Sequence, residues 1–277
     1  MTTLNLIGAG RVGQTLGHLF QTTGVFRVQS LLTRSARSGQ QALGFIGQGQ
    51  ACLDPADMPA ADIWMLAVPD SRIAAMAQQL ASLPLAQRPA LAFHCSGALC
   101  SGLLEPLRAK AWHVASAHPL LSFASPALAL AQFAGTPCAL EGDAAAVRTL
   151  ELAFSQIGAR CFALTASDKL LYHAGAVFAT NFLPVLQHLA EQLWQHSGMP
   201  ADLAQQMRAT LLQNAVNNIM ALGPKAAITG PAARGDLALV ARQGEAVTQW
   251  DAQAGTAYRA LSQLAAHLAQ ATSITPA

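Results

Sequence analysis

The chain has 277 residues, a length suited to two domains or one large one, and 52% of them are hydrophobic, which is enough for a substantial core. Charged residues make up only 11%, the formal net charge is +2 and no basic run occurs, so we expect no nucleic-acid partner. No segment reaches about 18 uninterrupted apolar residues, and the N-terminus starts a strand where a signal peptide would need a charged and then an apolar run. We therefore expect a cytoplasmic protein without a membrane role.

The cysteines indicate neither a metal site nor a disulfide framework. Their number is odd, they are scattered, and neither a C-x-x-C motif nor a histidine pair at metal spacing occurs. The five are Cys52, Cys95, Cys100, Cys138 and Cys161. We interpret them as small buried hydrophobes, of which only Cys95 lies near a predicted site, and we predict no bound metal.

A glycine-rich turn near the N-terminus is the most informative motif. It follows an apolar strand, Leu4 to Ile7, and opens a helix whose apolar residues recur at helical spacing. The first glycine permits a sharp turn, the second lets a pyrophosphate touch bare backbone, and the third lets helix and strand pack closely. The helix N-terminus adds unpaired N–H groups and the positive end of a dipole. The residues predicted to bind the dinucleotide here are Gly8, Ala9, Gly10, Arg11, Val12 and Gly13.

The end of a second predicted strand, over residues 26–33, indicates which dinucleotide fits. An NAD site of this type places a carboxylate there for the ribose 2′-hydroxyl, whereas an NADP site uses arginine and hydroxyl side chains for the 2′-phosphate. The strand ends in Thr33, Arg34 and Ser35, and no carboxylate occurs between residues 8 and 54. Unless Arg34 is an ordinary solvated residue, the sequence favours NADP as the cofactor.

A central strand follows a short helix over residues 36–45 and a brief strand over 50–53. Residues 61–69 form a near-continuous apolar run, which is typical of a parallel strand buried on both faces. Ligands on such sheets bind at the carboxyl ends of strands, so Ala67, Val68 and Pro69 should pass beneath the ribose and pyrophosphate. Asp70 then has the character of a cap for a helix over 71–81, and we assign it no catalytic role.

Two later strands each deliver a histidine to the same sheet edge. Residues 89–94 form an apolar strand that ends in His94 and runs into Ser96, with a helix expected from about Leu99, and residues 112–121 form another strand that carries His118. A histidine at a strand end is often a satisfied core residue, so His94 stays open between that role and substrate binding. We expect His118 to bind substrate and the Ser96 hydroxyl to contact it.

Strands over residues 135–140 and 160–164, on either side of a helix over 143–157, bring the total to about eight. Beyond Thr165 the apolar period is helical throughout. Helices are predicted over 168–196, 200–222, 236–243 and 251–271, with a glycine- and proline-rich turn over 223–235. The fold class is thus α/β, with a doubly wound Rossmann-type sheet in residues 1–164 and an all-α domain in 165–277. So apolar a helical domain is most easily explained as half of a homodimer.

Lys169 is the predicted catalytic acid of a nicotinamide-dependent reaction. It is the sole lysine between Lys110 and Lys225, it lies in the first turn of a nearly all-apolar helix, and His173 shares its face. An ammonium group in an apolar cleft has its pKa lowered toward neutrality, which suits proton transfer. The alternative is a solvated lysine at a helix start, where the helix dipole would not favour it.

Two polar residues of the helical region are further candidates for substrate binding. Asn181 interrupts an apolar stretch, and it either satisfies buried backbone or contacts substrate. Arg234 lies in the loop TGPAARGD and could grip a substrate carboxylate bidentately, from its own chain or from a partner's. Alternatively, Arg234 and Asp236 hold the turn together by pairing with each other.

The chain carries, in this order, the segments GAGRVG, TRS, AVPDSRI, FHCSGAL, AHPLLSF, DKLLYHAGAVFATNFL and TGPAARGD. Together they resemble a family of bacterial proteins with a Rossmann-like NADP-binding domain and a helical C-terminal domain of unknown function. The resemblance covers nearly the whole chain, and some members of that family have been linked to reduction of ketopantoate.

More broadly, the chain resembles the superfamily of 6-phosphogluconate, 3-hydroxyisobutyrate and ketopantoate-type dehydrogenases and pyrroline-5-carboxylate reductases. In the hydroxyacid enzymes a catalytic lysine begins the first long C-terminal helix, and an asparagine follows one turn later. Lys169 matches that lysine, whereas His173 stands where the asparagine would be. This departure bears on the identity of the substrate.

The motifs and the resemblance together imply an NADP-dependent oxidoreductase that reduces the carbonyl of a small 2-oxo acid or related substrate. In this hypothesis Lys169 protonates the developing alkoxide, His173 and Ser96 orient it, and Arg234 holds a carboxylate. One alternative is imine reduction of pyrroline-5-carboxylate reductase type, which needs no lysine acid because the substrate arrives protonated. Another is a non-catalytic protein that senses NADPH by binding it.

Overall fold

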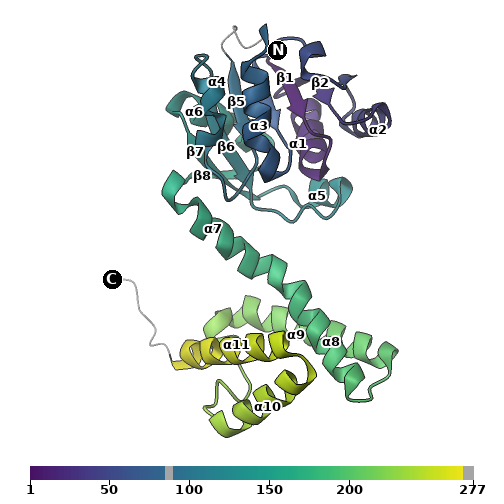
Figure 1. Cartoon of the computed structure of the whole chain (residues 1–277), viewed down its shortest axis with the longest axis vertical. Helices are drawn as coiled ribbons and strands as arrows, with labels where there is room; N and C mark the ends of the chain where they lie inside the picture. Colours follow the sequence, from purple (N-terminus) through teal and green to yellow (C-terminus); the bar gives the residue numbers. More distant parts are fainter. Residues whose placement is uncertain (85–89, 271–277) are drawn as a thin grey trace. The chain divides into compact units, whose positions relative to one another are not determined.

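The computed structural model describes residues 1–84 and 90–270 of the chain. The chain divides into two compact units, Met1–Thr180 and Asn181–Ala277 (Figure 1). The sheet ends at Ala163, whereas the first unit continues to Thr180. The expected strand start at residue 89 and the expected helix end at residue 271 lie outside the described residues.

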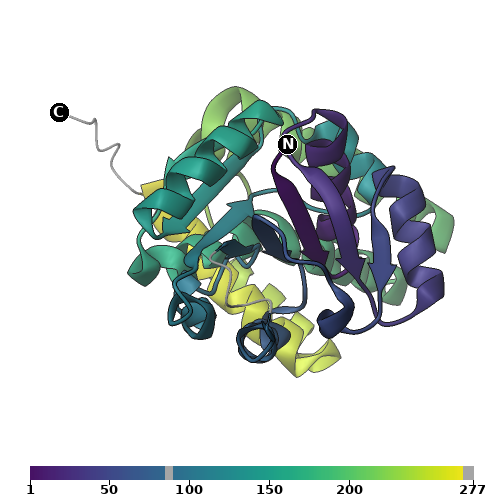
Figure 2. The ribbon, with the colours of Figure 1, turned by 90° about the horizontal axis from the view of Figure 1, so that it is seen from above.

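An eight-stranded sheet forms the centre of the first unit (Figure 2). Its strand order is β3-β2-β1-β4-β5-β6-β7-β8, and the first six of these strands run parallel, in the order of a doubly wound dinucleotide-binding sheet. β7 pairs antiparallel with β6 and parallel with β8, so the last two strands run the other way. The predicted Rossmann-type α/β fold is confirmed. The strands are β1 Thr3–Ile7, β2 Arg27–Leu32, β3 Gln50–Cys52, β4 Ile63–Leu66, β5 Leu91–His94, β6 His113–Pro119, β7 Pro137–Gly142 and β8 Arg160–Ala163.

Helices cover both faces of this sheet through their apolar stripes. On one face, α1, α2 and α6 pack on the strands through residues such as Phe20, Ile46 and Phe154. On the other face, α3 and α4 pack through Leu80 and Leu107 beside two buried tryptophans of the sheet layer. Each face therefore has a core of its own, as a doubly wound sheet requires. The helices of this part are α1 Arg11–Thr22, α2 Ala36–Ile46, α3 Asp70–Ala81, α4 Glu105–Arg108, α5 Pro126–Gln132 and α6 Ala144–Gln156.

Two local predictions in this unit were wrong. Asp70 does not cap α3, because Pro69 occupies the N-cap position and Asp70 is the first helical residue, where its carboxylate accepts a 2.9 Å hydrogen bond from Ser96 Oγ. The helix expected from about Leu99 begins later, as a 3-10 turn over Ser101–Leu104 that leads into α4. At Asp70, a tertiary contact with the loop after β5 takes the place of the local cap.

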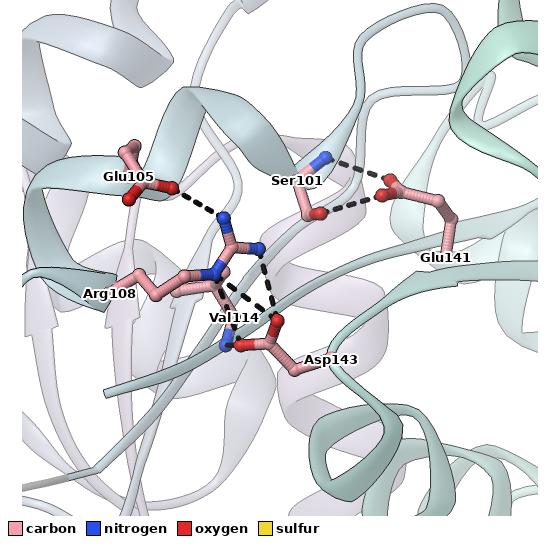
Figure 3. A network of polar contacts seen from close by, with 6 residues as sticks. All are labelled: Ser101, Glu105, Arg108, Val114, Glu141 and Asp143. Atoms are coloured by element: carbon pink, nitrogen blue, oxygen red, sulfur yellow. Dashed lines mark hydrogen bonds and ion pairs between the residues drawn. The ribbon is translucent and has the colours of Figure 1, made fainter. Parts of the chain in front are cut away.

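An ion-pair network fixes α4 to the sheet (Figure 3). The Arg108 guanidinium lies 3.1 Å from Asp143 Oδ1 and also pairs with Glu105, one turn earlier on α4. The other oxygen of Asp143 accepts a 2.8 Å hydrogen bond from the Val114 amide of β6. The network therefore ties together α4, β6 and the start of α6, next to the place where the strand direction reverses.

The long helix expected over residues 168–196 is present, but it is not uniform. It consists of α7 Lys169–Ala176, a π-helical segment Val177–Asn181 and α8 Phe182–His196. A π-helical turn takes more residues than an α-helical turn, so side chains beyond it are rotated relative to those of α7. The division between the two compact units, after Thr180, falls within this segment.

The regular secondary structure in the described residues of the second unit is helical, with α9 Ala201–Ala227, α10 Leu237–Trp250 and α11 Ala252–Gln270 after α8. The helical backbone of α9 breaks at Gly223, which has φ 77° and precedes Pro224. The helix end predicted near residue 222 is therefore a kink, after which α9 continues to Ala227. α10 and α11 approach closely, because a Cβ on Gly255 would lie 2.6 Å from the Cα of Thr248. None of the described helices is long and apolar enough to cross a membrane.

Candidate active site

Two glycines of the turn between β1 and α1 are closely packed, and a third is open. Gly8 has φ +107°, and a Cβ there would lie 2.9 Å from the carbonyl carbon of Ala67. A Cβ on Gly13 would collide with the carbonyl oxygen of Gly8. By contrast, a Cβ on the exposed Gly10 would meet nothing within 4 Å. Packing thus requires the first and third glycines, while the second presents open backbone.

The N-terminus of α1 is free to receive an anion. Gly10 is its N-cap, no side chain caps the helix there, and its first turn contains no acidic residue. The first amides of a helix have no intrahelical acceptor, and the helix dipole favours negative charge at this end. The exposed Arg11 lies at the same end, and the Ala9 carbonyl accepts a 2.7 Å hydrogen bond from Gln14, which holds the turn. Half-buried Val12 anchors the helix against the core.

The end of β2 presents the groups expected for a 2′-phosphate, with one difference. Thr33 is buried, and its hydroxyl donates a 2.9 Å hydrogen bond to the Ser35 carbonyl, so Thr33 shapes the turn. The Ser35 side chain accepts from the Ser38 amide at 3.3 Å and caps α2. Arg34 lies between them and is exposed. The surface groups at this point are therefore a guanidinium and a serine hydroxyl.

Ala67, Val68 and Pro69 lie where the sequence places them, directly after β4. The Ala67 amide donates a 2.8 Å hydrogen bond to the Ile7 carbonyl at the end of β1. Both Ala67 and a Val68 methyl group lie against Gly8. The carboxyl end of β4 therefore forms one wall of the glycine turn.

Lys169, the first residue of α7, is among the most deeply buried charged residues of the described chain, with 1% of its surface exposed. Its Nζ donates a 2.7 Å hydrogen bond to Ser116 Oγ and a 3.1 Å hydrogen bond to the Ser96 carbonyl. Burial lowers the pKa of this ammonium group, and the negative charges of Glu141 and Asp70 partly oppose that shift. The alternative of a solvated lysine at a helix start is contradicted by this geometry.

Ser96 positions Lys169 through its backbone, and its hydroxyl has other partners. The hydroxyl donates to Asp70 Oδ2 at 2.9 Å and accepts from the Leu99 amide at 3.0 Å. The Ser96 carbonyl accepts hydrogen bonds from Lys169 and, at 3.2 Å, from Ser116 Oγ. The structure therefore makes Ser96 a holder of Lys169 and of the loop after β5.

His94 has the contacts of a core histidine. It is fully buried, its Nδ1 accepts from the Ser96 amide at 3.2 Å, and its Nε2 lies 3.0 Å from the Cys100 carbonyl, to which it can only donate. Burial lowers the pKa of this imidazole, which keeps it neutral. Both ring nitrogens are therefore used by the backbone, and of the two roles left open by the sequence the structural one fits.

Two imidazoles and a phenol meet above Gly97. A Cβ on Gly97 would lie 2.5 Å from a His173 ring carbon and 2.8 Å from His118 Nε2, so only a glycine fits under the rings. His118 Nδ1 lies 3.0 Å from the Tyr172 hydroxyl, and the His118 and His173 ring centroids are 5.9 Å apart. Burial, aided by the positive charge of Lys169, lowers the pKa of His118 to about 4. At neutral pH His118 is therefore an uncharged hydrogen-bonding group.

The sequence analysis missed Ser116, Glu141 and Tyr172. Ser116 is a polar residue within the buried strand β6, which is the signal that could have identified it. The Glu141 carboxylate accepts hydrogen bonds of 2.8 Å and 2.6 Å from the amide and hydroxyl of Ser101, and it lies opposite Ser116 in the β6–β7 pairing (Figure 3). Finding Glu141 required knowing that β7 turns back beside β6.

Asn181 and Arg234 belong to the second unit, and both are exposed. Asp236 Oδ1 accepts a 3.2 Å hydrogen bond from the Leu239 amide and so caps α10. No ion pair joins Arg234 to Asp236 in the described part of the chain, which leaves the proposed pinning of the turn without support. Within the described ranges, no group of three His, Cys, Asp or Glu side chains could hold a metal ion.

Comparison with known protein families divides the chain in two. The Rossmann-like domain family matches residues 2–119, and a domain of unknown function, DUF2520, matches residues 136–265. The chain therefore joins a Rossmann-like domain to a DUF2520 domain. The DUF2520 match begins within the sheet, because it includes β7, α6 and β8 as well as the later helices. No curated protein matches the sequence.

Solved structures share this architecture over nearly its full length. A Bacteroides fragilis protein named as a putative NADP oxidoreductase is 22% identical to this chain, with a TM-score of 0.76. Protein TM1727 of Thermotoga maritima is 24% identical, with a TM-score of 0.74. Each alignment includes 96% of this chain and 98% of the other chain. The pyrroline carboxylate reductase of Plasmodium falciparum, solved with NADP bound, is 13% identical with a TM-score of 0.59 over 96% of this chain and 98% of that one. At these identities the likeness concerns the fold, which is one that nicotinamide-dependent reductases use.

Proposed function

We propose that this protein is an NADP-dependent oxidoreductase that reduces the carbonyl of a small 2-oxo acid or a related substrate. The observation that carries this proposal is Lys169, an ammonium group buried between the Ser96 carbonyl and Ser116 Oγ. β1, β4 and β5 are adjacent parallel strands, so Gly8, Ala67 and Ser96 follow one another along one sheet edge. A proton donor thus lies on the same edge as the glycine turn.

The residues of the first unit suit NADP. The open backbone at Gly10 and the uncapped N-terminus of α1 would hold the pyrophosphate. Arg34 and Ser35 would hold the 2′-phosphate, since a guanidinium makes charge-assisted, bidentate contacts with phosphate oxygens. Once bound, the reduced cofactor supplies a hydride to a carbonyl carbon.

Lys169 would supply the proton that the carbonyl oxygen needs. An ammonium group has three N–H donors, and two of those of Lys169 have acceptors in Ser96 and Ser116, which leaves one for a substrate oxygen. Its lowered pKa brings proton loss closer to neutral pH than for an exposed lysine. After the transfer, the neutral amine remains held by the same two acceptors, because an amine can still donate to both.

The two imidazoles are the proposed orienting groups. The rings of His118 and His173 meet edge to face above Gly97, and no side chain at residue 97 covers them from below. A neutral His118, held by Tyr172, can donate to or accept from a substrate oxygen without adding charge. Asn181 and Arg234 remain proposed substrate ligands, with Arg234 acting in its own chain or in a partner's.

Imine reduction is the second candidate. The near-complete burial of Lys169 also suits a purely structural lysine, which this reaction would allow. In addition, three of the similar structures are pyrroline carboxylate reductases. An iminium substrate carries its own proton, so this reaction would not depend on Lys169. The third candidate, an NADPH-sensing protein, predicts tight binding without turnover.

We also propose that the protein is a homodimer through its helical unit. Large apolar side chains are exposed on α8, α9, α10 and α11, among them Met220 with 82% and Leu237 with 67% of its surface exposed. Exposed apolar surface on this scale is typical of an interface between subunits.

The test combines cofactor titration with a turnover screen. Calorimetry should show NADPH binding more tightly than NADH, and absorbance should show NADPH consumption with members of a panel of 2-oxo acids, cyclic imines and aldehydes. Lys169→Met keeps a similar length without the charge, and Lys110→Met is the matched control because Lys110 is exposed. We expect Lys169→Met to bind NADPH as the wild type does and to lose about 10²- to 10⁴-fold in kcat on 2-oxo acids.

Each other outcome selects an alternative. Full activity of Lys169→Met on an oxo acid would remove this lysine from the chemistry. Turnover of imines alone, equal in Lys169→Met and Lys110→Met, would support imine reduction. Tight NADPH binding with no consumption across the panel would support a sensor, and no heat with either nucleotide would overturn all three.

A further inference from the structure

Two cysteines that are distant in the sequence meet on neighbouring strands. Cys138 of β7 and Cys161 of β8 are direct partners in the parallel pairing of these strands, and both are free thiols. Neighbouring strands lie about 4.8 Å apart, which is within the Cα separation of roughly 4.4–6.8 Å that a disulfide can span. The backbone therefore places the two residues close enough to be joined.

Both side chains lie on the same face of the sheet, under α6. Cys138 belongs to the core on that face, and Cys161 packs against the same core. Cys161 Sγ lies 3.9 Å from Ser155 Oγ and 3.8 Å from the Glu151 carbonyl, and both of these residues belong to α6. Residues paired directly across adjacent strands have their side chains on the same face of the sheet. The two thiols are therefore neighbours as well as their backbones.

The two thiols differ in their access to solvent. Cys138 is completely buried, whereas Cys161 is partly exposed and lies on β8, which forms one edge of the sheet. A small solute can reach Cys161. Cys138 can react only with the oxidised form of Cys161. This is the division of roles between an attacking and a resolving cysteine.

The electrostatics of the pair agree with these roles. The hydrogen bond from Cys138, with a further one from Ser155, lowers the pKa of Cys161 to about 7, while the shared hydrogen bond and burial raise the pKa of Cys138. The thiolate is the nucleophile in thiol oxidation, so Cys161 is the member that reacts first. Burial raises the pKa of Cys95 to about 12, and burial also raises that of Cys52, so these two cysteines are inert by comparison.

We propose that Cys138 and Cys161 form a redox-active dithiol that a hydroperoxide converts into a disulfide. The Cys161 thiolate attacks one peroxide oxygen, the O–O bond breaks, and the other oxygen leaves as water or an alcohol after taking a proton. The Cys161 sulfur is thereby oxidised to a sulfenic acid. The Cys138 sulfur then attacks it, the S–S bond forms, and the sulfenic hydroxyl leaves as water with the Cys138 proton. In total the two thiols lose two electrons and two protons, and the peroxide is reduced.

This proposal corrects the interpretation of all five cysteines as small buried hydrophobes. That interpretation fits Cys52 and Cys138, which are buried, but Cys95, Cys100 and Cys161 are partly exposed. The pairing was invisible in the sequence because β7 and β8 are joined through α6, so their cysteines show no C-x-x-C spacing. The proposal is independent of the proposed function, and its test uses no nicotinamide cofactor.

The test treats the full-length protein with one equivalent of hydrogen peroxide and maps the products by mass spectrometry. We expect the intact mass to fall by two hydrogen atoms, the free thiols to fall from five to three, and a peptide pair joined through Cys138 and Cys161. Cys138→Ser should instead accumulate a Cys161 sulfenic acid that dimedone traps. Cys161→Ser should leave Cys138 reduced, and Cys52→Ala, the matched control, should behave as the wild type.

The mapping on the wild type decides the question even if a substitution at the buried Cys138 prevents folding, which circular dichroism would reveal. A different cysteine pair, oxidation spread evenly over the cysteines, or a Cys161 sulfinic acid with Cys138 still reduced would each overturn the proposal. Reduction by dithiothreitol should restore all five thiols, and failure to do so would also contradict it.

Discussion

The two units of this chain differ in how much of their apolar surface they bury for themselves. The first unit has a core on each face of its sheet, and its largest fully buried side chains include tryptophan and phenylalanine. In the described residues of the second unit, the buried positions are Ala204, Gly244, Ala254 and Gly255, and all four are small. The sheet unit is stabilised by burying large side chains, whereas the helices of the second unit approach closely at small residues and leave their large apolar side chains exposed.

This difference indicates where each unit obtains its stability. Burying a large aliphatic or aromatic side chain contributes about 1.5–3 kcal/mol, so the sheet unit gains stability from within the chain. Close contact at glycine and alanine buries little apolar area, so the helical unit gains less in this way. We therefore expect substitutions in the first unit to act on its own folding, and substitutions on the helical surface to act on association.

The largest effect is expected on the helical surface. Val216 and Met220 lie one turn apart on α9 and are 40% and 82% exposed, so replacing both by Glu should leave a monomer folded but place like charges in a symmetric interface. We expect dimer affinity to fall by a factor of about 1,000 or more, which corresponds to roughly 4 kcal/mol. Sedimentation equilibrium measures the change. Leu152→Glu on α6, where Leu152 is 68% exposed, is the matched control in the sheet unit. A wild type that is already monomeric would contradict the premise.

The next effect concerns the glycine turn of the sheet unit. Gly13→Ala should lower the free energy of unfolding by roughly 3 kcal/mol, because its Cβ would collide with the Gly8 carbonyl oxygen in a packed region. Gly10→Ala, whose Cβ meets nothing within 4 Å, should leave stability nearly unchanged and weaken NADPH binding instead. Urea denaturation and calorimetry separate the two quantities. Equal losses of stability in both variants would show that the turn is not packed as described.

A pH dependence of stability is expected from His118. Its pKa is lowered from 6.5 to about 4 in the folded protein, so between these values the unfolded chain binds a proton that the folded chain does not. Stability should therefore fall as the pH drops from 6.5 toward 4, by up to about 3 kcal/mol from this residue. His118→Gln should flatten the profile in that window, as measured by urea denaturation at several pH values. The pKa of the buried His94 is also lowered, so His94 contributes to the pH dependence in the same direction. The slope of stability against pH must therefore be compared between the wild type and His118→Gln. Identical slopes would contradict the lowered pKa of His118.

The smallest effect is expected at the end of β2. Arg34→Ala should weaken NADPH binding by about 10- to 100-fold, since a hydrogen bond to a charged group contributes roughly 1.5–3 kcal/mol. Binding of NADH, which has no 2′-phosphate, should be unchanged. The exposed Arg37 provides the matched control as Arg37→Ala. Equal weakening of both nucleotides by Arg34→Ala would place Arg34 away from the 2′-phosphate.

The features that the sequence could predict depend on short segments. The glycine turn and the order of strands and helices in the first unit follow from periodicity and local composition. Asp70 shows the limit of such reasoning. Its position before a helix has the local signature of a cap, yet its carboxylate binds Ser96, which lies on a different loop.

The site itself depended on chain segments that only the tertiary structure brings together. Lys169 Nζ contacts groups that follow β5 and lie in β6, and the imidazoles of His118 and His173 meet above Gly97. Cys138 and Cys161 meet because β7 and β8 pair at the edge of the sheet. None of these contacts has a fixed spacing in the sequence.

The sequence by itself determined the kind of fold and the place of the glycine turn, because both arise from hydrophobic periodicity and from glycines within a few neighbouring residues. The tertiary structure decided which side chains surround Lys169, which histidine is structural and which cysteines pair. The physical reason is that hydrogen bonds and burial act over a few ångströms in space, and strand order sets those distances independently of separation along the chain.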